Sequence, residues 1–429
     1  MKRFLFQFIL TVPLLLLGWH PARPTLTAQQ RKPEKKTPEK PLPLTSHLVL
    51  IFVDGLRNED WQNPKLNLPT LKSLQTQGAS VLNLESVYPS QSLPAHATIL
   101  TGMFPADHGI FADANLDEKW RKTLGEQTTT DLKTATILQL AKQSGLKTAV
   151  TNFPLVKEAT TDFNSQDFSQ TLVWLENNRP QLACFRFQEL AMAIQRFGLD
   201  SAEANRALEE IDTSLKKIVE TIERAGIKNE TTLLVVSSHG YAKVQQEFRP
   251  NVILAKKGWL TLDGKGNVAE WKAIARSFGG AAAVYLKDAK NEAAVKEVES
   301  LFEEVHKSEA SPIWRLISRQ DAVKLGADPH AAFFIEAAPG FAISEQAAGK
   351  RTTEKLSKDA AQAISGYIPS RSEMRGSLLL SGKGIKPQVL MEYAHLVDIA
   401  PTIARLLGLE LKPARGHALS ALFVQPNQK

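Results

Sequence analysis

Short apolar runs that stop abruptly at polar residues or glycine alternate along this chain with longer segments of helical periodicity. Apolar runs of this kind are typical of buried strands, and apolar residues three and four positions apart are typical of helices that cover a sheet. We expect strands at residues 47–55, near 147, near 182, at 233–236, at 281–288 and at 330–337, and helices at 69–78, 130–144, 201–226 and 394–409. Strands that alternate with helices predict an α/β fold, with a mostly parallel sheet sandwiched between helices.

Polar residues follow two of these strands directly. Asp54 and Gly55 come after the apolar run that begins at residue 47, and Ser238, His239 and Gly240 come after the run 233–236. In open parallel sheets, ligands bind at the carboxyl ends of the strands. The pattern therefore indicates that the chemistry of this protein lies beside Asp54 and His239.

The N-terminal segment has a different character from the rest. Lys2 and Arg3 precede an apolar stretch of about 15 residues, which is the layout of a secretory signal peptide. We expect a signal peptide over residues 1–28, or an uncleaved membrane anchor, then a Pro/Lys/Glu-rich extended linker over 29–46. The folded domain is expected over 47–425, with a smaller embedded subdomain at about 256–345. The protein is thus expected to be exported, either periplasmic or secreted, or membrane-anchored.

The distribution of charge argues against a nucleic-acid-binding protein, and the cysteine count excludes a disulfide-stabilised one. The formal net charge of +7 comes mostly from residues 1–45, which hold eight basic and two acidic side chains. A nucleic-acid-binding protein usually carries its positive charge on the folded domain, so we expect no nucleic-acid partner. Cys184 is the single cysteine, which excludes an internal disulfide, and its apolar surroundings indicate a core residue.

The stretch "VYPSQSLPAHATILTG", residues 87–102, contains the candidate nucleophile. A helix expected over 94–101 and ending at Gly102 places Ser92 at or just before the helix N-terminus, where backbone N–H groups favour an anion. Ser92 there is either a nucleophile for a phosphorus centre or a helix N-cap.

Five motifs in order carry a resemblance to a known family. These are "LIFVDGLR", "YPSQSLPAHATILTGMFPADHGI", "SSHG", "SGYIPSRSEMRGSLLLSGKGI" and "HLVDIAPTIARLLGL". Together they resemble the nucleotide pyrophosphatase/phosphodiesterase (type I phosphodiesterase) family of the alkaline phosphatase superfamily, from about residue 47 to 422. The resemblance implies an alkaline-phosphatase-like fold, two zinc ions, and a Ser or Thr nucleophile at the position of Ser92, which is the logic of two-metal hydrolysis.

The family's metal-ligand motifs are only partly present. By this resemblance, two of six side-chain ligands remain, Asp54 and His239. The replaced positions are Ser238 at the first metal, and Ala191, Gln195 and Ser365 at the second. The family's phosphate-binding Asn falls on Asp113, and a carboxylate there would repel phosphate. Glu189, Asp200 and His330 are conceivable replacement ligands, and structural roles are expected for each.

Three functional hypotheses remain open. The first is a pseudoenzyme that holds zinc at reduced occupancy or none, and binds a phosphate-ester-like small molecule or an unknown protein partner without turnover. The second is a working phosphodiesterase with Ser92 as nucleophile and one metal between Asp54, Ser92 and His239. The third is an envelope or nucleic-acid binding module that uses the basic tail. A membrane contact is expected only through an uncleaved N-terminal anchor.

Overall fold

The computed structural model describes residues 41–113, 115–116, 122–123, 132–156 and 162–425. The expected signal peptide (1–28) and most of the expected linker (29–46) lie outside these residues. No helix in the described part of the chain is both long enough and apolar enough to cross a membrane.

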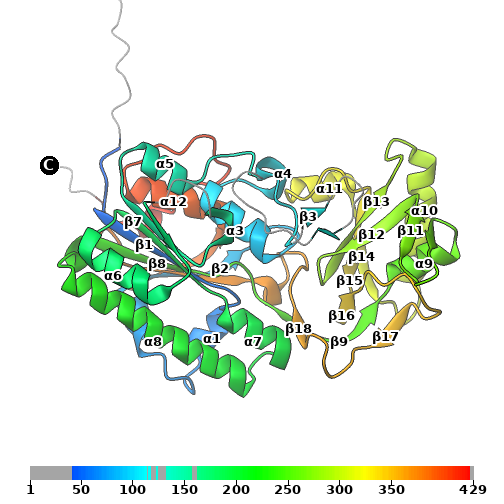
Figure 1. The fold of residues 1–429 in the computed structure, drawn as a ribbon, viewed down its shortest axis with the longest axis horizontal. Helices are drawn as coiled ribbons and strands as arrows, with labels where there is room; N and C mark the ends of the chain where they lie inside the picture. The colour runs from blue at the N-terminus through cyan, green and yellow to red at the C-terminus, as the bar shows by residue number, and fades with distance from the viewer. Residues whose placement is uncertain (1–40, 114, 117–121, 124–131, 157–161, 426–429) are drawn as a thin grey trace, which may run out of the picture. The chain divides into compact units, whose positions relative to one another are not determined.

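A single eight-stranded sheet forms the centre of the larger part of the fold (Figure 1). Its strand order is β20-β2-β19-β8-β1-β7-β5-β6. The strands are β1 (His47–Val53), β2 (Gly78–Glu85), β5 (Thr148–Thr151), β6 (Phe163–Ser165), β7 (Leu182–Phe187), β8 (Thr231–Val236), β19 (Gly376–Gly382) and β20 (Val389–His395). Strand β19 is antiparallel to both of its neighbours, and all other pairs are parallel. The α/β fold class is therefore confirmed.

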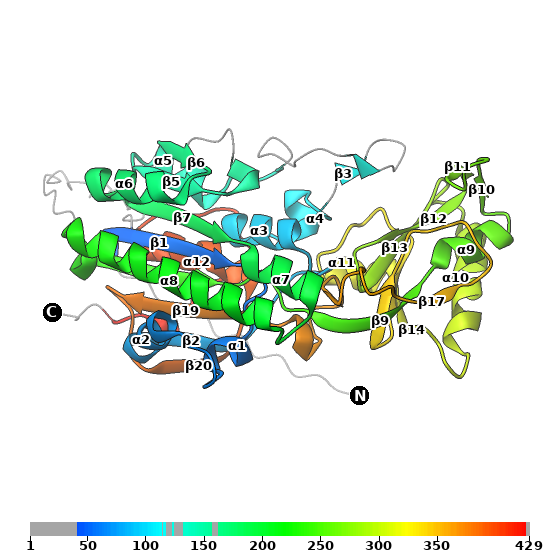
Figure 2. The same ribbon diagram turned by 60° about the horizontal axis from the view of Figure 1, so that its bottom comes forward.

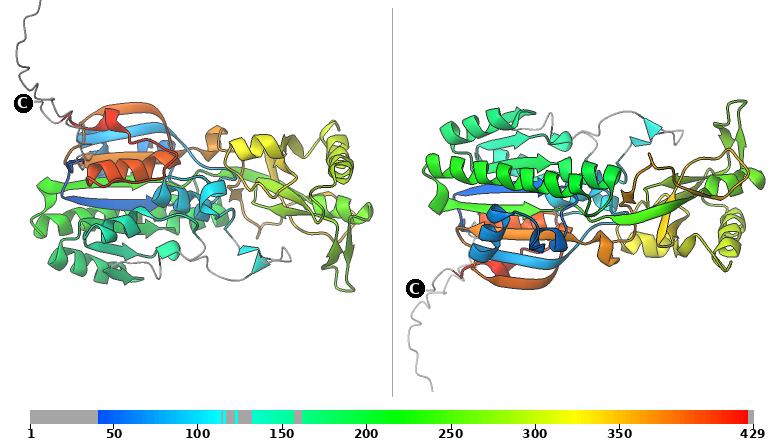
Figure 3. Two further views of the ribbon diagram at one scale, coloured as in Figure 1. Left: turned by 90° about the horizontal axis from the view of Figure 1, so that it is seen from above. Right: turned by 90° about the horizontal axis from the view of Figure 1, so that it is seen from below.

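Helices cover both faces of this sheet (Figures 2 and 3). Those on one face are α3 (Ser92–Thr101), α5 (Ile137–Gln143) and α12 (Ile399–Leu406), and those on the other are α2 (Pro69–Gln77), α6 (Phe168–Asn178), α7 (Glu189–Phe197) and α8 (Ala202–Arg224). The short helices α1 (Asn58–Gln62) and α4 (Pro105–His108) lie beside these layers.

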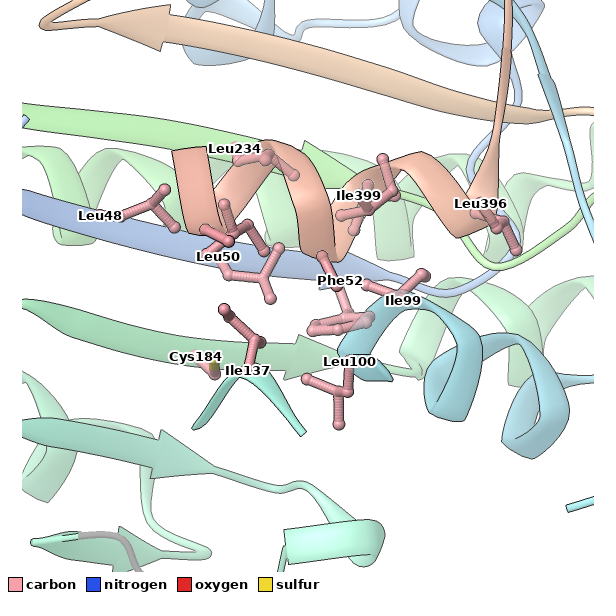
Figure 4. Close-up of a cluster of buried hydrophobic side chains, with 14 of the residues drawn as sticks. Leu48, Leu50, Phe52, Ile99, Leu100, Ile137, Cys184, Leu234, Leu396 and Ile399 are labelled. Carbon is pink, nitrogen blue, oxygen red and sulfur yellow. The ribbon is translucent and has the colours of Figure 1, made fainter. Parts of the chain in front are cut away.

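The side chains of β1 alternate between the two faces of the central sheet, and both faces are covered by apolar clusters. Leu48, Leu50 and Phe52 belong to one apolar cluster, together with Ile99 and Leu100 of α3 (Figure 4). The intervening residues Val49, Ile51 and Val53 belong to the cluster on the opposite face. A central parallel strand with both faces buried must be apolar at every position, which is the pattern that the sequence shows.

A second group of elements spans residues 242–364. One sheet of this group pairs β9 (Ala242–Phe248) with β16 (Gly340–Ile343), β17 (Thr353–Lys355) and β18 (Ala363–Ile364). A second sheet has the strand order β12 (Ala273–Ser277), β13 (Ala281–Leu286), β15 (Phe333–Ala337), β14 (Ile313–Ser318), and β10 (Leu260–Leu262) forms a hairpin with β11 (Val268–Trp271). The helices of this group are α9 (Pro250–Lys256), α10 (Glu292–His306) and α11 (Arg319–Lys324). This group has an apolar cluster of its own, which includes Phe248, Phe302 and Phe333. It is wider than the range 256–345 expected for the embedded subdomain because β9 and β18 pair with each other. Strands β3 (Asn115–Leu116) and β4 (Lys122–Thr123) pair with each other in an antiparallel hairpin.

The helix expected at 69–78 is present as α2, and Gly78 is its C-cap residue, in an extended conformation. Gly78 also begins β2, where a Cβ atom would lie 1.9 Å from the carbonyl oxygen of Leu380. Two other expected boundaries are wrong for identifiable reasons. The helix expected at 130–144 begins at Ile137, because Thr136 forms a capping box with Gln139. The helix expected at 394–409 begins at Ile399, because the preceding residues up to His395 pair in β20.

Candidate active site

Ser92 is the first residue of helix α3, and its hydroxyl points to the neighbouring strand end. The helix ends at Gly102 in the left-handed conformation, as expected. Ser92 Oγ lies 3.1 Å from Nε2 of His239, and the N-cap position is held by Gln91 without any side-chain cap. The Ser92 hydroxyl therefore contacts a histidine, and does not cap the helix.

His239 follows β8 and is fully buried. Its Nδ1 lies 2.9 Å from the carbonyl oxygen of Gly240, and a carbonyl oxygen can only accept. The proton of the neutral ring is therefore on Nδ1, and Nε2 is free to accept from the Ser92 hydroxyl. Burial lowers the pKa of His239, which favours this neutral form.

Asp54 follows β1 and has both carboxylate oxygens occupied. Oδ1 accepts from Nε2 of His96 at 2.7 Å and from Oγ of Ser238 at 3.2 Å, and Oδ2 accepts from Nε of Arg186 at 2.9 Å. Burial by itself would raise the pKa of Asp54, but the contacts with His96 and Arg186 outweigh it and hold the pKa well below its usual range. Asp54 is thus a buried carboxylate with a permanent positive partner.

Arg186 is the functional residue that sequence reasoning missed. It lies on β7, where it is paired in register with Phe52 of β1, so its side chain reaches the carboxylate two residues further along β1. Its side chain is only 13% exposed. A single arginine inside the apolar run "LACFRF", near the end of a strand beside the Asp54 strand, was the signal that could have identified it.

The positions of the second metal carry no strong ligand. Ala191 and Gln195 lie on α7, and Ser365 follows β18. The side-chain Nε2 of Gln195 donates to the hydroxyl of the buried Tyr241 at 3.1 Å, and the backbone carbonyl oxygen of Gln195 accepts from the backbone N–H of Gln362 at 2.8 Å. The structure therefore places α7 beside β18, and the neutral side chains of Gln195 and Tyr241 are hydrogen-bonded to each other there.

Asp113 lies at the N-terminus of helix α3. Its Oδ1 accepts the backbone N–H of Leu93 at 2.7 Å, and its own backbone N–H donates to Oε1 of Gln91 at 3.0 Å. The first free N–H groups of a helix attract anions. The carboxylate of Asp113 already occupies one of them, at the point where the Ser92 hydroxyl faces His239.

A zinc ion does not fit the residues present. At the first position both oxygens of Asp54 are engaged, and a guanidinium cation stands 2.9 Å from one of them, where it would repel a second cation. At the second position Ala191 has no donor atom, and an amide and a hydroxyl are weak zinc ligands beside imidazole, thiolate and carboxylate. In the part of the chain that the structure describes, no group of three or more His, Cys, Asp or Glu side chains could hold a metal.

Asp200, His330 and several further polar residues near the site have structural partners. Asp200 accepts from Arg57 at 3.2 Å, and His330 bonds to Asp328. Arg371 pairs with Glu373, and Arg375 lies 3.7 Å from Glu85. Cys184 is fully buried, and burial raises the pKa of its thiol.

Comparison with solved structures identifies the fold class of this protein. Murine ectonucleotide pyrophosphatase / phosphodiesterase 5 has a similar fold with a TM-score of 0.69 at 18% identity, over 88% of this chain and 100% of the murine chain. The human protein of the same name gives 0.70 at 16% identity, again over 88% and 100%. Together with a large sheet flanked by helices, this defines an alkaline-phosphatase-like fold.

The family follows from the sequence comparison. The family model "Type I phosphodiesterase / nucleotide pyrophosphatase" matches residues 48–361, which is well over half of the chain, so the protein belongs to this family. A venom phosphodiesterase of Crotalus durissus collilineatus is 25% identical over 220 residues, which are 46% of this chain and 26% of the relative. Ectonucleotide pyrophosphatase/phosphodiesterase family member 3 of Mus musculus is 25% identical over 214 residues, 45% of this chain and 24% of the relative. The match thus spans about a quarter of the length of these relatives.

Proposed function

We propose that this protein is an exported member of the type I phosphodiesterase family in which two-zinc phosphoester hydrolysis is lost or strongly reduced, and which binds a ligand or partner without turnover. The observation that carries the proposal is the buried ion pair between Asp54 and Arg186. A metal ion and a guanidinium cannot share the same carboxylate without strong repulsion. Four replaced ligand positions, Ala191, Gln195, Ser238 and Ser365, support the same conclusion.

Zinc content tests this proposal directly. The purified chain is dialysed against micromolar zinc, then against buffer, and analysed for zinc per chain. We expect well below one zinc, since two side-chain ligands are fewer than the three or four usual for a protein zinc site. Two tightly held zinc ions per chain would overturn the proposal.

A metal-independent hydrolase is the second candidate, and the contact between Ser92 and His239 favours it. With its Nδ1–H held by Gly240, His239 presents a lone pair to the Ser92 hydroxyl, which is the arrangement of a nucleophile and its general base. In an aryl phosphodiester, Ser92 Oγ would bond to phosphorus, its proton would pass to His239, and the aryl oxide would leave. Water would then attack the phosphorus, break the Ser92 Oγ–P bond and release a phosphate monoester, with the Ser92 hydroxyl restored. The test is hydrolysis of such an ester in the presence of a chelator. A rate that Ser92→Ala abolishes supports the hydrolase, and equal background rates exclude it.

Export is supported by the names of the relatives and by the N-terminal pattern. The names describe venom enzymes and ectonucleotide enzymes, and Lys2 and Arg3 precede an apolar stretch of signal-peptide length. N-terminal sequencing of the protein from its natural host tests this. A mature chain that begins after Ala28 supports a cleaved signal peptide, and an intact N-terminus in the membrane fraction supports an anchor.

A further inference from the structure

A pocket of about 870 Å³ lies in the second group of elements. Its walls come from β11 and β12, from the end of β13 and the turn that follows it, and from the segments around Arg319 and His330. None of its lining residues belongs to the candidate active site. Its volume is within the range of about 300–1,000 Å³ that is typical of small-molecule sites.

Hydrogen bonds hold the floor and the rim of this pocket in place. The hydroxyl of Tyr285 donates to Oδ2 of the buried Asp328 at 2.8 Å. Oδ1 of Asp328 accepts from both the backbone N–H and Nδ1 of His330, at 2.9 and 2.7 Å. On the same rim, Nε of Arg319 donates to the carbonyl oxygen of Ala331 at 2.8 Å. A site whose side chains are already held loses little entropy when a ligand binds.

The lining of the pocket has an excess of positive charge. It contains two lysines and two arginines but only one acidic side chain, Glu270. Lys287 pairs with Glu270 at 3.2 Å, and Arg276 pairs with Glu345 at 3.1 Å. Lys290 and Arg319 have no carboxylate within 4.0 Å among the described residues. Among the described residues, Lys290 and Arg319 therefore have no ion-pair partner.

The same pocket presents an aromatic surface. Trp271 of β11 lines it and is only partly buried, beside Val268 and Leu286. The ammonium group of Lys287 lies 5.6 Å from the centre of the Trp271 ring. A partly exposed indole next to cationic groups suits a ligand that combines a flat ring with an anionic group, because the ring stacks and the anion pairs with lysine and arginine.

We propose that this pocket binds a phosphorylated ring compound of about the size of a mononucleotide, with the phosphate between Lys290 and Arg319 and the ring against Trp271. The site is independent of the proposed function, because it uses no residue of the candidate active site. It lies next to the segment that leads to Asp113, since the rings of His330 and Phe111 are in edge-to-face contact with centroids 6.5 Å apart.

The experiment is calorimetric titration of the full chain with AMP at low ionic strength. We expect saturable binding to one site, weaker binding of adenosine, which lacks the phosphate, and weaker binding of inorganic phosphate, which lacks the ring. Lys290→Glu is expected to weaken AMP binding about tenfold, because it replaces an attraction by a repulsion. Trp271→Ala is expected to weaken AMP binding but to leave inorganic phosphate unchanged.

Two variants make the result decisive. Lys272→Glu has the same charge change at an exposed neighbouring residue outside the lining, and we expect AMP affinity within about twofold of the wild type, since exposed charges are screened by salt. Ser92→Tyr obstructs the candidate active site and is also expected to leave AMP binding unchanged. No saturable AMP binding, equal losses in Lys290→Glu and Lys272→Glu, or loss only in Ser92→Tyr would each overturn the proposal. The zinc measurement is unaffected by any of these outcomes.

Discussion

The guanidinium of Arg186 lies 2.9 Å from the carboxylate of Asp54, at the ends of the neighbouring parallel strands β7 and β1. Arginine keeps its charge at every accessible pH, so this carboxylate has a cation of its own. The buried negative charge of Asp54 is therefore neutralised by another side chain of the same chain.

Removal of Arg186 is expected to destabilise the fold. Arg186→Met preserves length and apolar contacts but leaves the Asp54 carboxylate buried with His96 and Ser238 as its remaining partners. Breaking one side of a buried ion pair typically costs about 3–5 kcal/mol, and the His96 contact retains part of that. We expect a loss of about 3 kcal/mol in the free energy of unfolding at pH 7, measured by denaturant titration.

The matched control is Arg224→Met. Arg224 pairs with Glu176 at 3.1 Å, but both side chains are more than one third exposed. Exposed pairs contribute about 0–1 kcal/mol, so this variant should be nearly as stable as the wild type. Equal unfolding free energies for Arg186→Met and wild type would mean that the ion pair does not stabilise the site.

The fold and the main polar residues at the strand ends could be predicted from the sequence. The apolar runs before Asp54 and His239 are continuous, and continuous apolar runs between helical segments are characteristic of central parallel strands. Parallel strands that neighbour each other bring their carboxyl ends together, and β8 and β1 are neighbours. The five ordered motifs then indicated the family, which the family model confirms over residues 48–361.

The contacts of the site could not be predicted in the same way. Asp54 and Arg186 are 132 positions apart, and the contact depends on the register of β1 against β7, which no local pattern specifies. Ser92 and His239 are 147 positions apart, so the sequence around Ser92 does not indicate that His239 is its partner. Strand β2 was not among the expected strands, and the close approach of its first residue, Gly78, to Leu380 is a tertiary contact that no local pattern specifies.

Asp113 is expected to keep phosphate away from the N-terminus of helix α3. Asp113→Asn preserves an oxygen that can accept the Leu93 N–H but removes the negative charge. A unit charge a few ångströms away contributes about 1 kcal/mol in a water-like environment, so affinity for inorganic phosphate should rise about fivefold. The titration is made with chains that also carry Lys290→Glu, so that phosphate binding in the pocket lined by Trp271, Lys290 and Arg319 does not contribute. Asp263→Asn, in the exposed turn of the β10–β11 hairpin, should leave the affinity unchanged; an equal rise in both variants would contradict a local effect.

Glu336 on β15 is fully buried and should destabilise the protein at alkaline pH. Burial raises the pKa of this carboxyl from 4.5 to about 7, although Tyr88 and the backbone N–H of Ile368 offset part of the effect. The folded state therefore holds a proton that the unfolded state releases, and this contribution is complete below pH 4.5 and is lost as the pH rises through 7. Glu336→Gln cannot ionise, so we expect it to match the wild type near pH 5 and to be more stable by roughly 2 kcal/mol at pH 8. The exposed Glu297→Gln should show no such difference between the two pH values.

His108 is buried at the end of helix α4 and should make stability fall towards acidic pH. Burial lowers the pKa of His108 from 6.5 to about 3. Its ring is neutral in this structure, because Nδ1 accepts the Ile110 N–H at 3.1 Å and a protonated ring has no nitrogen that can accept. The other ring nitrogen, Nε2, lies 3.0 Å from Oγ1 of Thr98. Between pH 6.5 and 3 the unfolded state binds a proton that the folded state does not. The contribution of the neutral ring is therefore complete above pH 6.5 and is lost as the pH falls through this window.

The variant that isolates this effect is His108→Gln, which cannot take up a proton. It should be less stable than the wild type at pH 7, because a packed and hydrogen-bonded ring is replaced. Its disadvantage should shrink by at most roughly 1.4 kcal/mol for each pH unit between 6.5 and 4, since the wild type alone loses the His108 contribution. The measurement is the free energy of unfolding of both chains by urea titration at pH 7, 6, 5 and 4, with the exposed His417→Gln as control. A difference between wild type and His108→Gln that stays constant over this range would mean that His108 takes up its proton in the folded state, and that the buried neutral ring is not the acid-sensitive element of the helix α3 and α4 region.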